Sequence, residues 1–345
     1  MTSKSAAPRT SVMQVWSQTR YGGPEVARAE VVEVPAPGAG EVLLTVRATS
    51  LNAGDVHLMR GDPLLVRLAF GLRRPRIATR GMDVAGTVQA IGPAADSMAP
   101  TFVIGDEVMG ELPGGGLAEF VVARADALVR RPEGLDPVAA AAIPIAAGTA
   151  LLALDIGAVA DGQRVLVIGA AGGVGTFSVQ LAALRGAEVW ALCGARAEPL
   201  IASLGAARTF DYTRVDPANS PAELPHGGFD VVIDIAGRAP LRRLRALCTP
   251  AGALVIVSGE GSRVSGPLGR MLRAGMLGLT RGARIRLVAA KADTRATATL
   301  AALAADGAIA PVVERTWPLA EAGAALAHID AGHTVGKIVV IAGAS

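Results

Sequence analysis

The sequence predicts an α/β protein in which a doubly wound parallel sheet is joined to a smaller, β-rich domain. Three observations predict this fold: short strands with Gly and Pro turns in the first part of the chain, apolar strands alternating with helices in the second, and a glycine-rich turn after one of those strands. A length of 345 residues suits two domains of about 150 residues each. With 51% apolar and 18% charged residues, the chain can bury a large core.

The first domain is expected to span residues 13–134, after a disordered tail at 1–12. Its predicted strands are Val31–Val34, Glu41–Ala48, Ala85–Ile91, Glu107–Met109 and Ala118–Val122. Gly- and Pro-rich turns separate them, which is typical of a small barrel or rolled sheet. Residues Leu64–Arg80 interrupt this pattern, because Arg67, Arg73, Arg74 and Arg76 lie there among apolar residues. We expect a helix-and-loop insertion, for which a lid is one candidate role.

The second domain is expected to span residues 135–307. Its predicted strands are Val165–Ile168, Glu188–Leu192, Arg208–Phe210, Val231–Ile235, Ala253–Val257 and Ile285–Ala289, and its helices Val174–Arg185, Ala197–Leu204, Leu241–Cys248 and Thr294–Ala305. Apolar strands joined by helices form parallel sheets covered on both faces, and six in this order describe a Rossmann-type sheet. Residues 308–345, with a strand at Val312–Val313, a helix at Leu319–Ile329 and a last strand at Lys337–Ile341, are expected to complete the first domain.

The strongest motif is a glycine-rich turn between a predicted strand and a predicted helix. Its residues are Gly169, Ala170, Ala171, Gly172, Gly173, Val174 and Gly175. Glycines permit the tight turn and the close approach of a pyrophosphate, and the helix N-terminus supplies free N–H groups. We therefore expect dinucleotide binding here.

The end of the next strand predicts which dinucleotide is bound. An NAD enzyme carries an acid there, but this chain has Cys193, Gly194, Ala195 and then Arg196, whose guanidinium can pair with a 2′-phosphate. Tyr212 follows the third strand and is expected to close the same pocket. NADPH is thus the predicted cofactor. The backbone at Ala236 and Ser258, after the fourth and fifth strands, is expected to contact its nicotinamide half.

Several spaced motifs resemble the medium-chain dehydrogenase/reductase superfamily, in its zinc-independent, quinone oxidoreductase-like branch. They are Ser50–Asp55, Gly81–Gly86, Gly105–Val108, Ala147–Ala150, the glycine-rich turn and Gly332–Lys337. The resemblance covers nearly the whole chain from Met13 and implies a GroES-like fold for the β-rich domain.

The resemblance also implies roles for individual residues. Asn52 is placed near the nicotinamide ribose and the substrate, Thr149 near the nicotinamide, and Lys337 on the cofactor side. His57 stands where quinone reductases often have Tyr, and we weigh two interpretations equally, a proton donor or a residue that lines the pocket. Asn52, His57 and Thr149 are the candidate catalytic residues.

No metal is expected. Metal-dependent relatives carry Cys at the position of Asn52 and a His-Glu pair at Met82-Asp83, and a Met thioether is a poor Zn²⁺ ligand. Without zinc, the carbonyl oxygen of the substrate must be polarised by hydrogen bonds from the protein.

The predicted function is NADPH-dependent hydride transfer to a small-molecule quinone or activated alkene. The alternatives are an NADP-dependent alcohol dehydrogenase or ketone reductase, an enoyl-thioester reductase with Arg73, Arg74 and Arg76 as phosphate contacts, and a non-enzymatic NADPH sensor. A net charge of only +3 and no basic runs argue against nucleic acid. No segment resembles a signal peptide or a membrane span, so we expect a cytoplasmic protein without a membrane partner. The resemblance alone implies a homodimer.

Overall fold

The computed structural model describes residues 12–93, 102–219, 221–257, 268–278, 280–289 and 291–342. The chain divides into two compact units. The first comprises residues 1–62, 66–145 and 292–345, and the second comprises residues 63–65 and 146–291. Helix α3 (Pro137–Ala141) and helix α9 (Thr294–Ala305) therefore belong to the first unit, not to the second as the predicted boundaries of 134/135 and 307/308 imply. The reason is packing, since α3 contacts β3 and β4 while α9 contacts β7.

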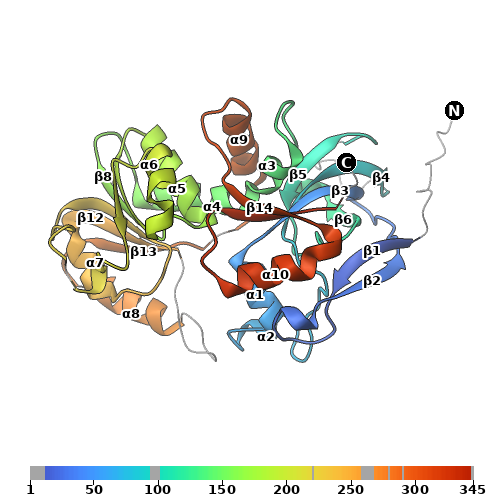
Figure 1. Cartoon of the computed structure of the whole chain (residues 1–345), viewed down its shortest axis with the longest axis horizontal. Helices are drawn as coiled ribbons and strands as arrows, with labels where there is room; N and C mark the ends of the chain where they lie inside the picture. The colour runs from blue at the N-terminus through green and yellow to red at the C-terminus, as the bar shows by residue number, and fades with distance from the viewer. Residues whose placement is uncertain are drawn as a thin grey trace. The chain divides into compact units, whose positions relative to one another are not determined.

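A seven-stranded sheet forms the body of the first unit (Figure 1). Its order is β14 (Val313–Pro318), β15 (Lys337–Ile341), β3 (Glu41–Leu51), β4 (Asp83–Ile91), β5 (Glu107–Glu111) and β7 (Leu128–Arg130), and β6 (Phe120–Arg124) pairs with β3. Apolar side chains of β3, β4 and β5, among them Leu44, Val84 and Val108, are buried together. The predicted β-rich domain is confirmed, and the last strand lies where the sequence predicted it.

The last strand, β15, places residues from the end of the chain beside residues of β3. β15 pairs antiparallel with β3, and the register sets Ile338 opposite Leu51 and Val339 opposite Ser50. One residue further, Lys337 and Asn52 therefore reach the same corner of the sheet. Residues 285 positions apart in the chain are brought together in this way.

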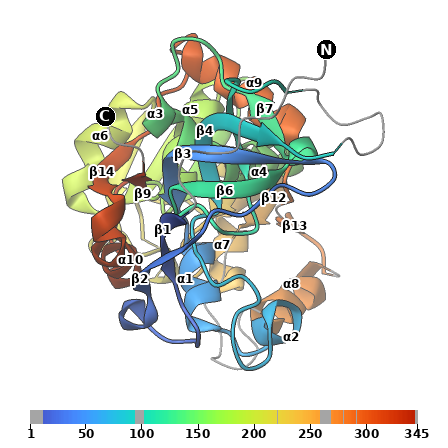
Figure 2. The ribbon, with the colours of Figure 1, turned by 90° about the vertical axis from the view of Figure 1, so that its right-hand side faces the viewer.

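Helices α1 (Ala53–Arg60), α2 (Val66–Phe70) and α10 (Ala322–Ala331) also belong to the first unit. Both views place α2 beyond α1, on the side away from the seven-stranded sheet (Figure 2). The predicted insertion is thus a short helix followed by a loop. Residues 1–11 lie outside the described part, but Val12 was assigned to the predicted tail and instead begins β1 (Val12–Ser17), which pairs with β2 (Arg28–Glu33).

The second unit is a six-stranded parallel sheet, as predicted. Its order is β10 (Arg208–Asp211), β9 (Glu188–Cys193), β8 (Arg164–Ile168), β11 (Phe229–Asp234), β12 (Cys248–Ile256) and β13 (Arg284–Leu287). Figure 1 shows α5 (Gly173–Leu184) and α6 (Glu198–Ser203) on one face, and α7 (Leu241–Leu247) and α8 (Leu268–Gly278) on the other. Helix α4 (Pro144–Gly157) leads into this unit. From β8 the strands are added on one side as β9 and β10, and from β11 on the other side as β12 and β13, so the order of strands reverses between β8 and β11. In sheets of this kind, ligands bind at the carboxyl ends of the strands at that point.

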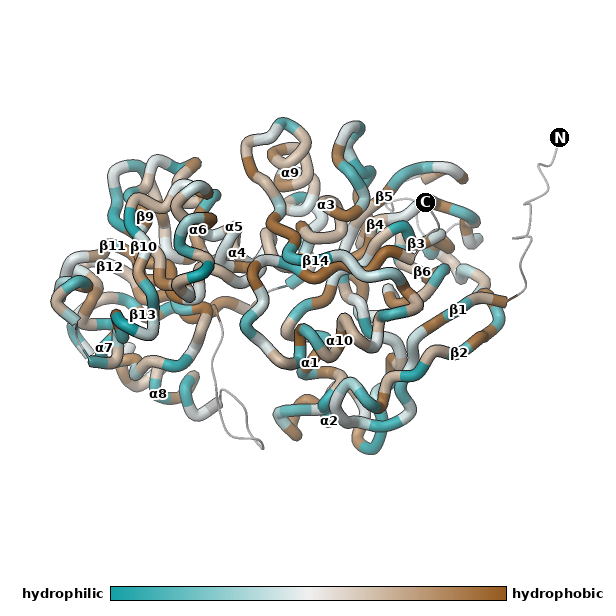
Figure 3. Tube along the Cα trace, viewed as in Figure 1, coloured by the Kyte–Doolittle hydropathy of each residue, from teal (hydrophilic) through white to brown (hydrophobic). Residues whose placement is uncertain are grey.

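Apolar residues fill the strands of both sheets, as the hydropathy along the chain shows (Figure 3). In the second unit, Leu166, Val232 and Leu254 of neighbouring strands are fully buried in one cluster. Among the described residues, no helix is both long enough and apolar enough to cross a membrane.

Candidate active site

Asn52 lies where β3 ends and α1 begins, and it is partly buried. Its backbone is extended, with φ −124° and ψ 161°, so it precedes the first helical turn as an N-cap residue does. The Asn52 N–H donates to Asp55 Oδ2 at 2.9 Å, and the Asp55 N–H donates to the Asn52 carbonyl at 2.9 Å. These two bonds fix the Asn52 backbone, and with it the direction in which the side chain leaves the turn.

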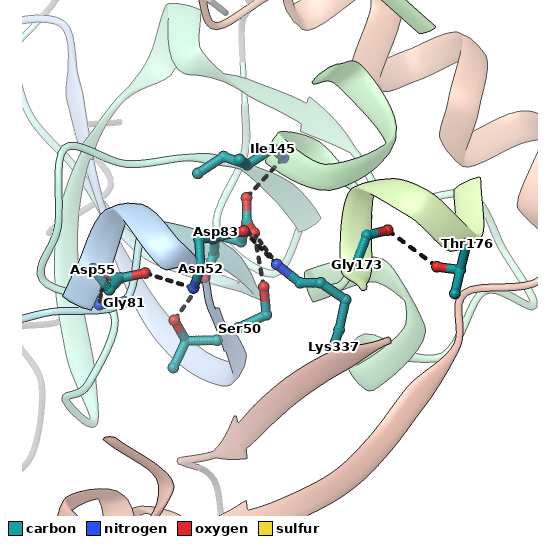
Figure 4. Close-up of polar contacts among 10 residues, drawn as sticks. Ser50, Asn52, Asp55, Gly81, Asp83, Ile145, Gly173, Thr176 and Lys337 are labelled. Carbon is teal, nitrogen blue, oxygen red and sulfur yellow. Dashed lines mark hydrogen bonds and ion pairs between the residues drawn. The ribbon is translucent and has the colours of Figure 1, made fainter. Parts of the chain in front are cut away.

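The side chain of Asn52 belongs to a network around Asp83, the first residue of β4 (Figure 4). Asp83 is fully buried. Its Oδ2 accepts hydrogen bonds from Ser50 Oγ at 2.7 Å, from Asn52 Nδ2 at 2.9 Å and from Lys337 Nζ at 3.2 Å. Its Oδ1 accepts from the backbone N–H of Ile145 at 3.0 Å. All four groups thus donate hydrogen bonds to the carboxylate, and such bonds stabilise a buried charge.

Lys337 completes the network, since its Nζ also donates to Asn52 Oδ1 at 2.5 Å. A lysine only donates and an ionised carboxylate only accepts. The Asn52 amide can therefore point only one way, with its oxygen on Lys337 and one Nδ2–H on Asp83. The second Nδ2–H of Asn52 has no acceptor among the described residues. That hydrogen is available to a bound molecule.

The negative charge of Asp83 has two compensating partners. One is Lys337, whose side chain is 3% exposed. The other is the beginning of α4, because Ile145 is the second residue of that helix and a helix N-terminus carries a partial positive charge. The network is a neutralised ion pair rather than a lone buried charge.

Asp55 holds the turn beside this network. It is fully buried, and its Oδ1 accepts from the backbone N–H of Gly81 at 2.7 Å while its Oδ2 holds Asn52. Burial raises the pKa of Asp55 to about 6, against the lowering effect of these backbone bonds and of Arg80. Both carboxylate oxygens bind backbone, so Asp55 positions the turn.

Glu111 is a second carboxyl beside Asp83. It lies on β5 directly opposite Asp83 of β4, so both side chains project from the same face of the sheet. Burial, and then the like charge of Asp83, raise the pKa of Glu111 to about 7. Nothing in the sequence pattern singled out this residue.

His57 is not joined to the network. It is exposed on α1, and its Nδ1 lies 3.0 Å from the carbonyl oxygen of Asp62. A carbonyl only accepts, so Nδ1 carries a proton and Nε2 of the neutral ring is an acceptor. Nε2 could therefore donate a proton only in the imidazolium form.

Thr149, the third candidate catalytic residue, lies on α4 four residues after Ile145 and is buried. It belongs to the second unit, whereas Asn52 and His57 belong to the first. An added Cβ at the neighbouring Gly148 would meet no atom within 4 Å. The helix backbone is therefore uncovered next to Thr149.

The predicted glycine-rich turn joins β8 to α5 in the second unit. Gly169 has φ +88°, a conformation that favours glycine. An added Cβ at Gly175 would lie 2.2 Å from the Gly169 carbonyl oxygen, so the first turn of α5 packs on the loop through bare backbone. At Gly172, by contrast, an added Cβ would meet only one atom, at 3.7 Å. Gly169 and Gly175 are therefore required by the fold, whereas Gly172 leaves an unfilled space.

This space fits a diphosphate. Gly172 is the N-cap of α5, and the N–H groups of Gly173, Val174 and Gly175 have no acceptor among the described residues. Free N–H groups at the positive end of a helix, with no side chain in the way, are what a pyrophosphate needs. The residues present therefore fit a dinucleotide.

Arg196 and Tyr212 lie after the neighbouring strands β9 and β10. These strands are parallel, with Cys193 opposite Asp211, and the Tyr212 N–H donates to the Cys193 carbonyl at 3.0 Å. The Tyr212 ring lies against Gly194 and is 46% exposed. Both residues are thus brought to the carboxyl edge of the sheet that also bears the glycine turn.

Ala236 also lies at this edge, with its backbone nitrogen 3.1 Å from the position of an added Cβ at Gly169. Ser258 lies outside the described residues. Asp234, just before Ala236, is buried, and its carboxylate accepts from the Gly237 N–H at 3.0 Å and pairs with Arg270 at 2.5 Å. Asp234 therefore fastens the loop and α8.

Two members of the network, Asp83 and Ser50, were not among the predicted site residues. Asp83 was considered only within the family motif Gly81–Gly86 and as part of a missing zinc motif. The one available signal was an acid at the start of an apolar strand, which is costly unless the acid is paired. As for metals, no group of three or more His, Cys, Asp or Glu side chains that could hold an ion occurs in the described ranges.

Comparison with known proteins gives two family matches. Residues 38–133 match the alcohol dehydrogenase GroES-like domain, and residues 204–340 match the zinc-binding dehydrogenase family. The chain is 34% identical to the chloroplastic quinone-oxidoreductase QR1 of Triphysaria versicolor, over 93% of this chain and 95% of that protein.

Two further proteins are similar over nearly their full length. The mitochondrial NAD(P)H oxidoreductase RTN4IP1 of Mus musculus is 31% identical, over 96% of this chain and 90% of that protein. The solved structure of the quinone oxidoreductase from Coxiella burnetii superposes with a TM-score of 0.82 at 25% identity, covering 96% of this chain and 100% of that one.

Proposed function

Because the chain belongs to the medium-chain dehydrogenase/reductase superfamily, in its quinone oxidoreductase-like branch, we propose that it reduces a quinone or activated alkene with NADPH and without zinc. Membership already makes it an NAD(P)H-dependent oxidoreductase. The finer proposal concerns the choice of dinucleotide, the device that polarises the substrate and the class of acceptor. One observation carries it: Asn52 presents an amide N–H whose direction is fixed by Lys337 and Asp83, at the position where the resemblance implies a metal ligand in zinc-dependent relatives.

The dinucleotide is held by the second unit. The N–H groups of Gly173, Val174 and Gly175 bind the diphosphate, and Gly172 gives it room. When bound, the nicotinamide supplies a hydride. The chain's own residues contribute binding, orientation and hydrogen bonds.

NADPH is favoured over NADH by the residues that follow β9. That strand ends at Cys193, and no Asp or Glu lies between it and Arg196 to bind a ribose 2′-hydroxyl. A guanidinium instead suits a 2′-phosphate, and Tyr212 flanks the same edge of the sheet.

Substrate polarisation is assigned to Asn52. Its free Nδ2–H would donate to the carbonyl oxygen of the acceptor, where negative charge develops during reduction. Lys337 holds the amide oxygen, and a cation on that side polarises the amide and strengthens the opposite N–H as a donor. The network is assembled before substrate binds, so little reorganisation is required.

Zinc independence is supported by the donor set. Asn52 and Met82 are poor zinc ligands, and Asp83 is fully occupied by Ser50, Asn52, Lys337 and Ile145. A neutral amide donor cannot stabilise an alkoxide as zinc does. This favours conjugated acceptors, whose charge is delocalised, over simple ketones.

A homodimer is proposed as well. Among the described residues β13 has a strand neighbour on one side only, and Leu272 and Met276 of the nearby α8 are each 71% exposed. An unpaired strand edge beside exposed apolar residues is a self-complementary surface. Light scattering coupled to gel filtration would test it, and a monomeric mass at micromolar concentration would contradict it.

The test of function is a screen of NADPH oxidation, followed by absorbance, over quinones, enones, enoyl thioesters and simple ketones. We expect turnover with quinones or enones that survives dialysis against a chelator. Turnover confined to simple ketones, or lost with the chelator and restored by Zn²⁺, would contradict the proposal.

A further inference from the structure

Residues 66–76 of the first unit, which we call the docking segment, present apolar side chains to solvent. They comprise α2 and the loop after it. Leu68 is 64% exposed, Phe70 45% and Leu72 69%. Single exposed apolar residues are common, but three large ones within five positions form a patch that calls for a partner.

The docking segment is fixed in place rather than loosely attached. The Tyr21 hydroxyl donates to the Gly71 carbonyl oxygen at 2.5 Å, and the Arg67 guanidinium lies 4.4 Å from the centre of the Tyr21 ring. Arg67 Nε also donates to the carbonyl oxygen of Gly61 at 3.0 Å. The inner side of the segment is therefore anchored to the body of the unit.

The turn within the segment is also specific. The Arg76 N–H donates to the Phe70 carbonyl oxygen at 2.7 Å, and Pro75 is buried. Gly71 has φ +122°, and an added Cβ would lie 2.1 Å from the Arg74 carbonyl oxygen, so only glycine fits. These contacts hold Leu68, Phe70 and Leu72 outward, although burying them would be favourable.

The charge of the segment is entirely positive. Its sequence contains Arg67, Arg73, Arg74 and Arg76 and no acid. Arg73, Arg74 and Arg76 are exposed, and none of their guanidinium groups has an acceptor among the described residues. Figure 3 shows apolar and hydrophilic residues side by side over α2 and its loop.

We propose that the docking segment binds the surface of an anionic lipid bilayer, with Leu68, Phe70 and Leu72 entering the boundary between headgroups and acyl chains and the arginines contacting lipid phosphates. Exposed apolar side chains next to unpaired cations suit this interface, which offers both an apolar layer and anionic groups. The absence of a membrane-spanning segment led us to expect no membrane partner. Binding to the bilayer surface does not require a membrane-spanning segment.

The segment is close to the candidate site along the chain. Asn52 is the N-cap of α1, an eight-residue helix of about 12 Å, and the segment starts shortly after α1 ends. If the proposed function holds, an acceptor dissolved in the bilayer would enter near Asn52. The bilayer contact itself does not depend on that function.

Vesicle flotation without cofactor or substrate tests the contact. The wild type is compared with Leu68→Ser/Leu72→Ser, with Arg73→Gln/Arg74→Gln/Arg76→Gln, and with Val31→Ser as a control. Val31 is 68% exposed on β2, so its variant removes an equally exposed apolar side chain elsewhere on the same unit. Vesicles contain phosphatidylcholine alone or mixed with phosphatidylserine.

We expect the wild type and Val31→Ser to float with phosphatidylserine vesicles only, and high salt to release them. Each arginine near an anionic surface contributes about five-fold to the partition coefficient, so the triple variant should lose on the order of 100-fold. The leucine variant should also stay with the soluble fraction.

Wild type that does not bind, or variants that bind as the wild type does, would overturn the proposal. So would a leucine variant that only changes the oligomeric mass, because the partner would then be a second copy.

Discussion

Lys337 Nζ lies 2.5 Å from Asn52 Oδ1, although 285 residues separate the two in the chain. The antiparallel register of β15 on β3 creates this contact, and Asp83 of β4 accepts from both side chains. The contact fixes the polarity of the Asn52 amide. One strand pairing thus determines which atom the candidate site offers to a substrate.

Replacing Lys337 with Met should destabilise the protein by about 3 kcal/mol, because Asp83 would remain buried without its cationic partner. Urea unfolding followed by circular dichroism would measure the difference. Lys291→Met is the matched control, since Lys291 is exposed, and should change stability by less than about 0.5 kcal/mol. Equal effects of the two substitutions would refute the structural role of the pair.

Substitutions in the glycine turn should separate folding from cofactor binding. Gly172→Ala adds a methyl group that the fold accommodates at 3.7 Å, so we expect a normal melting temperature but NADPH affinity lowered at least about ten-fold. Gly175→Ala adds one 2.2 Å from the Gly169 carbonyl oxygen and should destabilise the unit itself. Calorimetric titration with NADPH measures the affinity of each variant, and thermal melts measure its stability. Unchanged affinity in Gly172→Ala would mean that the diphosphate lies elsewhere.

Arg196→Ala should weaken NADPH binding by roughly 10- to 100-fold and leave NADH binding nearly unchanged, because only NADPH carries the 2′-phosphate. Fluorescence titration with both dinucleotides measures the ratio. Arg124→Ala, an exposed arginine of the first unit paired with Asp126, is the control. Equal losses for NADPH and NADH would remove the specificity argument.

Stability should decrease between about pH 4.5 and pH 7 through Glu111. Burial and Asp83 raise its pKa to about 7 from an ordinary 4.5, so the folded protein holds this proton more tightly than the unfolded chain. The stabilisation is complete below the unfolded pKa and is lost as pH rises through the folded one. Asp55, with its pKa raised to about 6, contributes with the same sign.

Glu111→Gln should therefore be more stable than the wild type at pH 8, by about 1–2 kcal/mol once solvent screening of this half-buried carboxyl is allowed for. The difference should vanish at pH 4. Urea unfolding across this range would show it. A wild-type advantage at pH 8 would mean that Glu111 is stabilised as an anion.

Local patterns predicted most of the fold. The glycine turn between β8 and α5 could be identified because a strand, a turn and a helix N-terminus are contiguous in sequence. Arg196 and Tyr212 could be placed at one edge of the sheet because parallel strands end on the same side. The boundaries of the units were less accessible, since α3 and α9 join the first unit through packing on β3, β4 and β7.

The network around Asp83 could not be predicted from local pattern. The sequence near Asp83 and Glu111 does not predict that these residues lie opposite each other on β4 and β5. The pairing of Asn52 with Lys337 likewise depends on which strand β15 joins. Non-local strand register follows from the whole fold, and a short motif does not contain it.

The most direct test of the account compares turnover and NADPH binding in Asn52→Ala and Ser50→Ala. Each variant removes one hydrogen bond to Asp83, but only the first removes the donor proposed for the substrate. We predict that Asn52→Ala lowers kcat at least about 100-fold, with the NADPH dissociation constant within about three-fold of wild type, while Ser50→Ala keeps most of its turnover. Asn52→Ala turning over as fast as Ser50→Ala would contradict the central claim.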